Sequence, residues 1–238
     1  MQIHIFGKGF NYSQDGPGNR LVYHLSGCNL RCPWCSNPEG LFGTGRAVED
    51  EAMIREILSA RPMFFDGGGV TFTGGECSLQ TDALLHVIDT VRAEGVNVAI
   101  ESNATTDDFL RLAPACDVVI ADYKHADAGR FREVCGGELS AVEAHLSQLT
   151  RSKFVHIRIP LIHNFNDGEQ DAAGFVRFLS GLLTDAFDVE LLSYHEYGKE
   201  KWEKCGQTYR VQDGYVSEER MRALRDALIA AGVRVVHT

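Results

Sequence analysis

Three cysteines near the N-terminus have the side chains and the spacing for metal chemistry. Cys28, Cys32 and Cys35 form a C-x3-C-x2-C pattern on one short segment. Three thiolates on one loop can hold a cubane iron–sulfur cluster and leave one of its irons without a protein ligand. An open coordination position is what separates catalytic from structural metal sites. The pattern therefore favours an iron–sulfur centre at which a further ligand can bind.

Zinc and an inert thiol cluster are the alternatives to this interpretation. Zinc modules usually combine a C-x2-C pair with a second pair or with histidines downstream. The remaining cysteines at positions 77, 116, 135 and 205 are scattered along the chain. Buried cysteines can also serve only as small core residues. The spacing favours iron–sulfur chemistry, and zinc stays open at this point.

Length and composition indicate a globular protein of ordinary type. The 238 residues are 44% hydrophobic and 24% charged, with a formal net charge of −10. This acidic balance argues against non-specific nucleic-acid binding. No apolar run is long enough to cross a bilayer, and the N-terminus lacks the apolar core of a signal peptide. Because seven cysteines occur without an export signal, we expect a cytoplasmic protein with no membrane association.

Strand-like and helix-like patterns alternate along the chain, which predicts parallel strands joined by right-handed crossovers. Strands are expected at 21–25, 70–72, 96–100, 118–121, 155–159 and 189–192. Helices are expected at 48–60, 82–93, 139–149 and 172–183, and from an N-cap at Ser217 to a stop at Gly232. Six units are too few for an eight-stranded barrel. We therefore expect a partial (β/α)6 barrel with an open parallel sheet, built as a single domain over 1–238.

In such folds the ligand site lies at the carboxyl ends of the strands. Polar residues lie at or just beyond the ends of the second to sixth strands in this sequence: Gly74-Gly75-Glu76, Glu101-Ser102, Asp122 and Lys124, Arg158, and His195. Paired glycines permit close backbone approach, and a carboxylate can hold an amine. Lys124 and Arg158 suit a carboxylate ligand. Together these groups predict a zwitterionic amino-acid ligand that carries a nucleoside.

Four segments resemble a known family. The cysteine loop, with Trp34 before its last cysteine, resembles the cluster loop of the radical S-adenosylmethionine (SAM) superfamily. The runs 15–20, 67–76 and 191–202 resemble those of glycyl radical enzyme activating enzymes. The resemblance extends from about residue 10 to the C-terminus. Since no cysteine lies between Cys35 and Cys77, the chain is similar to the short, single-cluster type, as in pyruvate formate-lyase activating enzymes.

The resemblance implies a role for each matching residue. Cys28, Cys32 and Cys35 would hold a [4Fe-4S] cluster whose open iron binds SAM. The residues implied to contact SAM are Trp34, Ser36, Asn37, Gly74, Gly75, Glu76, Ser102, Asp122, Lys124, Arg158 and His195. A monovalent cation near SAM is implied at Glu101 and Asp122. The residues implied to contact the partner protein are Asp15, Gly16, Pro17, Gly18, Gly198, Lys201 and Trp202.

The implied activity is reductive cleavage of SAM to a 5′-deoxyadenosyl radical, which takes a hydrogen atom from a glycine Cα of a partner glycyl radical enzyme. Reduced flavodoxin or ferredoxin would donate the electron, and a monomer is expected. Glu101 stands where the pyruvate formate-lyase type usually has Asp, and Ser193 replaces a proline, so the partner enzyme stays open. The alternatives are a radical SAM tailoring enzyme acting on a small molecule or peptide, and a non-enzymatic iron–sulfur electron carrier.

Overall fold

The computed structural model describes residues 1–43, 45–182 and 184–237. Contacts divide the chain into two compact units, each assembled from several segments. Unit 1 comprises Met1–Asn29, Asn37–Ser102 and Thr106–Ile120, and unit 2 comprises Leu30–Ser36, Asn103–Thr105 and Ala121–Thr238. The single domain over 1–238 stays a prediction. Among the described helices, none combines the length and the apolar character that a membrane span requires.

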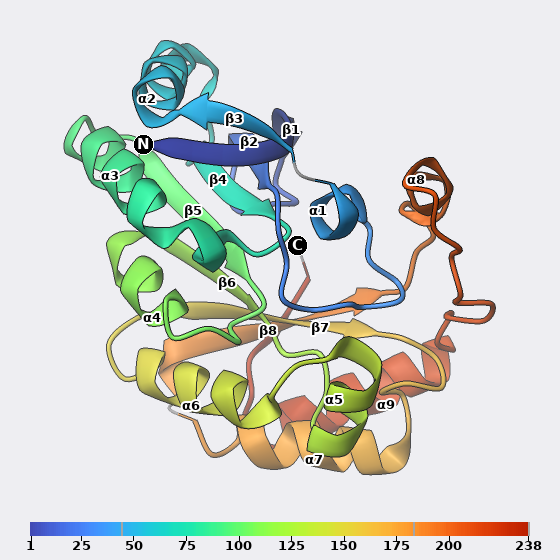
Figure 1. The fold of residues 1–238 in the computed structure, drawn as a ribbon. Helices are drawn as coiled ribbons and strands as arrows, with labels where there is room; N and C mark the ends of the chain where they lie inside the picture. Colours follow the sequence, from blue (N-terminus) through green and yellow to red (C-terminus); the bar gives the residue numbers. More distant parts are fainter. Residues whose placement is uncertain (44, 183, 238) are drawn as a thin grey trace. The chain divides into compact units, whose positions relative to one another are not determined.

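Unit 1 is a sheet with helices packed against it (Figure 1). Its strands lie in the order β3-β1-β2-β4-β5, with bounds β1 Gln2–Tyr12, β2 Asn19–Leu25, β3 Arg46–Glu49, β4 Gly69–Gly74 and β5 Asn97–Ser102. Strand β1 pairs antiparallel with both β2 and β3, whereas β2, β4 and β5 run parallel. The helices are α1 Glu39–Phe42, α2 Asp50–Ser59, α3 Thr81–Ala93 and α4 Phe109–Leu112. Strand β6, Val118–Asp122, starts in unit 1 and its last two residues belong to unit 2.

Unit 2 contains the parallel strands β7 Val155–Leu161, β8 Phe187–Ser193 and β9 Val235–Val236, in that order. Its helices are α5 Ala128–Cys135, α6 Leu139–Leu149, α7 Glu169–Leu179, α8 Lys199–Lys204 and α9 Glu218–Ala230. Along β7, buried residues alternate with half-buried ones. One face of this strand therefore packs in the core, while the other presents polar side chains.

The structure confirms all six expected strands and the open, mostly parallel α/β sheet. The five expected helices also form, and the Ser217 hydroxyl caps α9 by accepting from the Arg220 N–H at 3.3 Å. The helix expected at 139–149 has the observed bounds of α6. The helix expected at 172–183 corresponds to α7, which starts earlier, at Glu169, and ends at Leu179. Leu183 lies outside the described residues.

The sequence reading missed β1, β3 and β9. Strand β1 buries only Ile3 and Ile5 completely and contains Gly7 and Gly9, so its apolar pattern is weak. Strands β3 and β9 are short, with four and two residues. Such strands form through pairing with neighbours that are distant in sequence, and local propensity does not show them.

Arg20 is a fully buried cation that holds one end of unit 1 together. Its guanidinium donates to Thr71 Oγ1 at 2.7 Å, to the Val70 carbonyl at 2.8 Å and to the Pro17 carbonyl at 3.1 Å. It also donates to Asn97 Oδ1 at 3.0 Å. Burial lowers the pKa of Arg20 to about 10, so the side chain stays charged at neutral pH. These bonds tie β2, β4 and β5 to the loop that precedes β2.

We predict that Arg20→Met lowers the free energy of unfolding by about 3 kcal/mol, because several buried acceptors lose their donor at once. Urea unfolding followed by circular dichroism in anaerobic buffer measures this loss. The matched control is Arg111→Met, since Arg111 is 52% exposed and pairs with Asp82 and Asp108 at the surface. A loss below about 1 kcal/mol is expected for that control. Equal losses in the two variants would contradict the anchoring role of Arg20.

Candidate functional site

The backbone of Gly27, just before Cys28, is hydrogen-bonded on both sides. Its N–H donates to the Gly40 carbonyl at 2.9 Å, and its carbonyl accepts from the Glu76 N–H at 2.7 Å. The Gly75 N–H donates to the Leu25 carbonyl at 2.8 Å. A Cβ on Gly75 would overlap the Gly27 carbonyl. The paired glycines of the Gly-Gly-Glu segment are thus needed for contact with the base of the cysteine loop, a reason that the sequence did not reveal.

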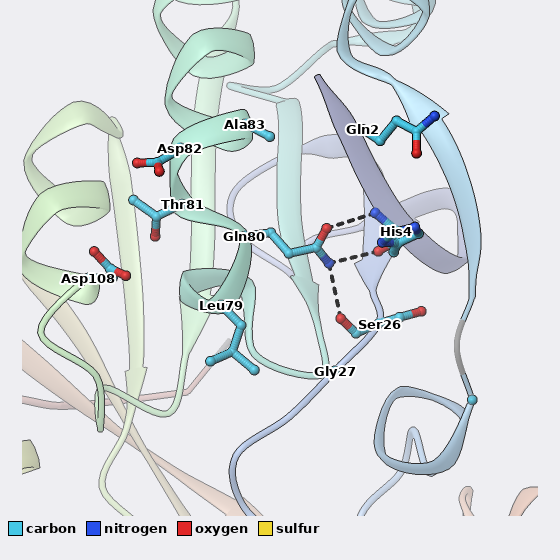
Figure 2. Close-up of a pocket in the computed structure, with 11 residues that line it drawn as sticks. Gln2, His4, Ser26, Gly27, Leu79, Gln80, Thr81, Asp82, Ala83 and Asp108 are labelled. Atoms are coloured by element: carbon cyan, nitrogen blue, oxygen red, sulfur yellow. Dashed lines mark hydrogen bonds between the residues drawn. The ribbon is translucent and has the colours of Figure 1, made fainter.

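Gln80 also holds the start of this loop (Figure 2). Its amide accepts from the His4 N–H at 2.7 Å and donates to the His4 carbonyl at 2.9 Å. It donates in addition to the Ser26 carbonyl at 3.0 Å. These groups line a pocket of about 590 Å³ that also includes Gly27 and the first residues of α3. One side chain therefore joins β1 to the residue where the chain leaves β2 for the cysteine loop.

Glu76 is a completely buried carboxylate with a set of hydroxyl donors. Its Oε1 accepts from the Ser78 N–H at 3.0 Å, from the Ser78 hydroxyl at 2.7 Å and from the Ser102 hydroxyl at 2.7 Å. The structure thus brings the predicted residues Glu76 and Ser102 into direct contact. A buried carboxylate held by neutral donors is suited to a cationic ligand group such as an α-ammonium.

Glu101 and Cys77 lie beside this carboxylate. The Thr73 hydroxyl donates to Glu101 Oε2 at 2.8 Å, and the Cys77 thiol donates to the Glu101 carbonyl at 3.3 Å. Burial raises the pKa of the Cys77 thiol well above its ordinary value. Cys77 is therefore a protonated core residue, which agrees with its interpretation as a small buried side chain rather than a ligand.

In unit 2, Lys124 and Asp122 form an ion pair of 2.6 Å at the end of β6. Burial lowers the pKa of Lys124, but the charge and hydrogen bond of Asp122, together with the neighbouring Cys32 and Cys135, hold the pKa above the ordinary value. Both residues were expected to contact the ligand. The structure shows that they contact each other, so the ammonium group is both charged and fixed in position.

Arg158 is paired across strands with Glu190, a residue that the sequence reading did not select. The two residues are opposite each other in the β7–β8 register, and Arg158 Nε donates to Glu190 Oε2 at 2.9 Å. His156 and Asp188 form a second pair on the same face, at 2.8 Å. In β7 and β8, polar residues alternate with apolar ones, and the polar residues are basic on β7 and acidic on β8. This pattern is the signal that could have revealed Asp188 and Glu190.

His195 lies in the turn after β8. Its ring stacks on Tyr197 with a centroid distance of 4.2 Å, and its Nδ1 accepts from the Tyr197 N–H at 3.4 Å. Burial lowers the pKa of His195. The imidazole is therefore neutral at physiological pH and can act as a hydrogen-bond donor or acceptor.

The second half of the cysteine loop is held by the segment around α8. Trp202 Nε1 donates to the Cys35 carbonyl at 2.9 Å, and Lys201 Nζ donates to the Ser36 carbonyl at 3.0 Å. A Cβ on Gly198 would overlap the Cys35 carbonyl. Three of the residues expected to contact a partner protein thus contact the cysteine loop of their own chain.

The Trp34 ring lies within the same loop and packs on Phe165, with ring centroids 4.6 Å apart. Asn37 follows the last cysteine by two residues and begins the turn into α1. The Asn37 carbonyl accepts from the Gly40 N–H at 3.0 Å. The structure therefore places both residues next to the cysteines, as the sequence requires.

The segment 15–18 lies at the other end of unit 1. It precedes β2. The β2–β4 ladder begins with the pair Arg20 and Gly69, close to this segment, and ends with the pair Leu25 and Gly74. The strands advance roughly 17 Å between these two pairs. The structure therefore does not bring Asp15, Gly16, Pro17 and Gly18 together with Gly74 and Glu76, and the partner contact of segment 15–18 stays a prediction.

The chemistry of the cysteines fits an iron–sulfur cluster. Cys32 is buried, and Cys28 and Cys35 are half-buried. A hydrogen bond from the Cys135 thiol lowers the pKa of Cys32, which favours the thiolate that iron binds. Among the described residues, no three His, Cys, Asp or Glu side chains converge on a single metal ion. A cubane does not require such convergence, because each cysteine binds a different iron.

The fold and the cysteine loop define an α/β protein with an iron–sulfur binding segment. The model of the radical SAM superfamily matches residues 22–176, and the chain belongs to this superfamily. A pyruvate formate-lyase-activating enzyme of Staphylococcus epidermidis is 31% identical over 211 residues, with 84% of each chain covered. A choline trimethylamine-lyase activating enzyme of Oleidesulfovibrio alaskensis is 28% identical over 264 residues, covering 83% of this chain and 85% of the relative.

The fold is also that of solved radical SAM structures. A radical SAM methyltransferase from Sphaerobacter thermophilus superposes with a TM-score of 0.67 at 18% identity, over 95% of this chain and 67% of that chain. The relatives named as activating enzymes match most of the chain, so the resemblance noted in its motifs is confirmed at the level of the family.

We predict that Gly75→Ala distorts the base of the cysteine loop, because the added Cβ would overlap the Gly27 carbonyl. After anaerobic reconstitution, the variant should bind less than about half of the wild-type iron, since a displaced ligand loop weakens a metal site. Iron analysis and visible absorbance measure this. Gly9→Ala is the matched control, because nothing lies within 4 Å of a Cβ at Gly9. Wild-type iron content in Gly75→Ala would contradict the prediction.

A second prediction concerns Trp202. Trp202→Phe keeps an aromatic ring but removes the donor to the Cys35 carbonyl, so the isolated, reconstituted protein should show altered cluster absorbance or faster loss of iron to a chelator. The control is Tyr197→Phe, an 80% exposed aromatic residue. If Trp202→Phe behaves like wild type in isolation and loses only binding to a partner enzyme, Trp202 is a partner contact and not a support of the loop.

Proposed function

We propose that this protein is a radical SAM activating enzyme that installs a glycyl radical in a partner enzyme. The observation that carries the proposal is the cysteine loop, followed at the next parallel strand by a buried carboxylate with hydroxyl donors. The match to activating enzymes over most of the chain supports the same reaction class.

The residues present fit the implied cofactors. Cys28, Cys32 and Cys35 would hold the [4Fe-4S] cluster. When bound, the cluster and SAM supply reductive cleavage of the sulfonium–carbon bond, which gives the 5′-deoxyadenosyl radical that removes a hydrogen atom from a glycine Cα. The protein's own residues orient the cofactor and exclude water.

Charge complementarity supports the assignment of groups to SAM. The buried Glu76 carboxylate suits the methionine ammonium, since a buried charge is stabilised by an opposite one. Lys124 and Arg158 suit the methionine carboxylate, Arg158 with its guanidinium oriented by Glu190. The neutral imidazole of His195 suits a hydroxyl or ring nitrogen of the adenosine.

The remaining proposed SAM contacts lie in the cysteine loop or at the ends of strands. They are Trp34, Ser36, Asn37, Gly74, Gly75, Ser102 and Asp122. Of these, Ser102 contacts the Glu76 carboxylate directly, so it would orient that carboxylate toward the ammonium group.

Finer parts of the proposal concern partners and conditions. We propose a glycyl radical enzyme as protein substrate, reduced flavodoxin or ferredoxin as electron donor, and action as a monomer under anaerobic conditions in the cytoplasm. Seven cysteines, an odd number, support a reducing compartment. A monovalent cation near Glu101 and Asp122 belongs to the same proposal.

Two measurements test the function. The anaerobically reconstituted protein should release 5′-deoxyadenosine when mixed with dithionite and SAM. Mixing with a pyruvate formate-lyase or a choline trimethylamine-lyase should then give the glycyl doublet in electron paramagnetic resonance. Release of 5′-deoxyadenosine without a doublet on any glycyl radical enzyme would favour a tailoring enzyme instead.

The matched variants for this test are Cys28→Ala and Cys205→Ser. The first should lose the cluster absorbance and reduce 5′-deoxyadenosine release by at least about 100-fold, because a missing ligand leaves the cluster unsupported. The second changes a cysteine outside the loop and should keep both signals. A colourless wild-type protein, or a Cys28→Ala variant with full iron content, would overturn the proposal.

A further inference from the structure

A buried amide links the ends of two strands in unit 2. Asn166 lies in the loop after β7 and is 1% exposed. Its Nδ2 donates to the Lys124 carbonyl and to the Pro160 carbonyl, both at 2.8 Å, and its Oδ1 accepts from the Ile162 N–H at 2.8 Å. Backbone groups thus satisfy both ends of the amide. The amide joins Lys124, which lies beyond the end of β6, to the end of β7.

His125 makes a second link in the opposite direction. Its Nε2 donates to the Phe165 carbonyl at 2.7 Å, while its Nδ1 accepts from the N–H groups of the next two residues at 2.9 Å. These bonds require the neutral imidazole with its proton on Nε2. Lys124 and His125 are adjacent in the chain, as are Phe165 and Asn166. Each of these two pairs therefore uses one side chain to bond the backbone of the other pair.

This arrangement holds Lys124 where it has left the sheet. Just beyond β6, the Tyr123 N–H donates to the Arg158 carbonyl at 2.8 Å. Lys124 follows outside the strand, so the Asn166 amide, rather than a neighbouring strand, holds its carbonyl. The Lys124 side chain is 12% exposed and forms the 2.6 Å ion pair with Asp122. Both the backbone and the ammonium group of this lysine are thus fixed.

We propose that Asn166 is a positioning residue for SAM, because it holds the backbone of the lysine that binds the methionine carboxylate. The inference rests on the proposed function, which assigns Lys124 to that carboxylate. Preorganised groups bind a ligand more tightly, since less freedom is lost on binding. Asn166 has no signature in the sequence, because Lys124 lies 42 residues away along the chain.

The test is a double-mutant cycle on SAM binding, measured by isothermal titration calorimetry on the anaerobically reconstituted protein without reductant. Asn166→Ala should weaken SAM binding by about 10-fold at unchanged iron content. Lys124→Met should weaken it by at least as much. In the double variant, Asn166→Ala should add less than about 2-fold to the effect of Lys124→Met, because the group through which Asn166 acts is then absent.

Asn164→Gly is the matched control. Asn164 lies in the same loop and is exposed, and its φ of 61° is one that glycine adopts readily. This variant should bind SAM as the wild type does. Asn166→Asp is a second test variant, because an ionised carboxylate can accept from the Ile162 N–H but cannot donate to the Lys124 carbonyl. It should weaken SAM binding as Asn166→Ala does.

Each other outcome has a defined meaning. Additive losses in the cycle, or wild-type SAM affinity in Asn166→Ala, overturn the inference and leave the proposed function intact. Failure of both Asn166 variants to fold or to bind iron also overturns it, since Asn166 then serves the fold. A wild-type protein that binds iron but not SAM defeats the proposed function itself, which is a separate result.

Discussion

The hydrogen bonds at Gly27 fix the Gly-Gly-Glu segment to the start of the cysteine loop in unit 1. The peptide is held between Gly40 and Glu76, and these contacts are short enough that Gly75 has no space for a side chain. The segment that supplies the buried carboxylate is therefore fastened to the strand that supplies Cys28. The backbone positions of Cys28 and Glu76 are therefore linked, because the same set of backbone hydrogen bonds holds both segments.

Cations at buried and half-buried positions are stabilised by different partners at each place in the structure. Arg20 is satisfied by carbonyl, hydroxyl and amide oxygens and serves the fold. Lys124 and Arg158 are each paired with a carboxylate, at Asp122 and Glu190. A paired cation keeps its charge in a poorly solvated setting, where it interacts strongly with an anionic ligand. The acidic partners thus orient groups whose proposed task is to bind a carboxylate.

The sequence predicted six of the described strands, five of the described helices and the chemistry of the cysteine loop, because these depend on local periodicity and spacing. It did not predict the contacts that depend on tertiary approach. Trp202 is far from Cys35 in the chain, and its motif suggested a partner surface, yet its indole bonds the loop carbonyl. Glu190 was overlooked because a single carboxylate in a strand has meaning only with its cross-strand neighbour, Arg158. The edge strands β3 and β9 were missed for the same reason.

The placement of the tryptophans has a spectroscopic consequence. The chain contains two: Trp34 within the cysteine loop, and Trp202 hydrogen-bonded to the carbonyl of Cys35. Intrinsic fluorescence of this protein is therefore a local signal from one loop rather than an average over the fold. Iron–sulfur clusters absorb broadly across the emission range of indole, so energy transfer links this emission to the loading of the loop. The intrinsic tryptophan fluorescence of the protein therefore reports cluster assembly.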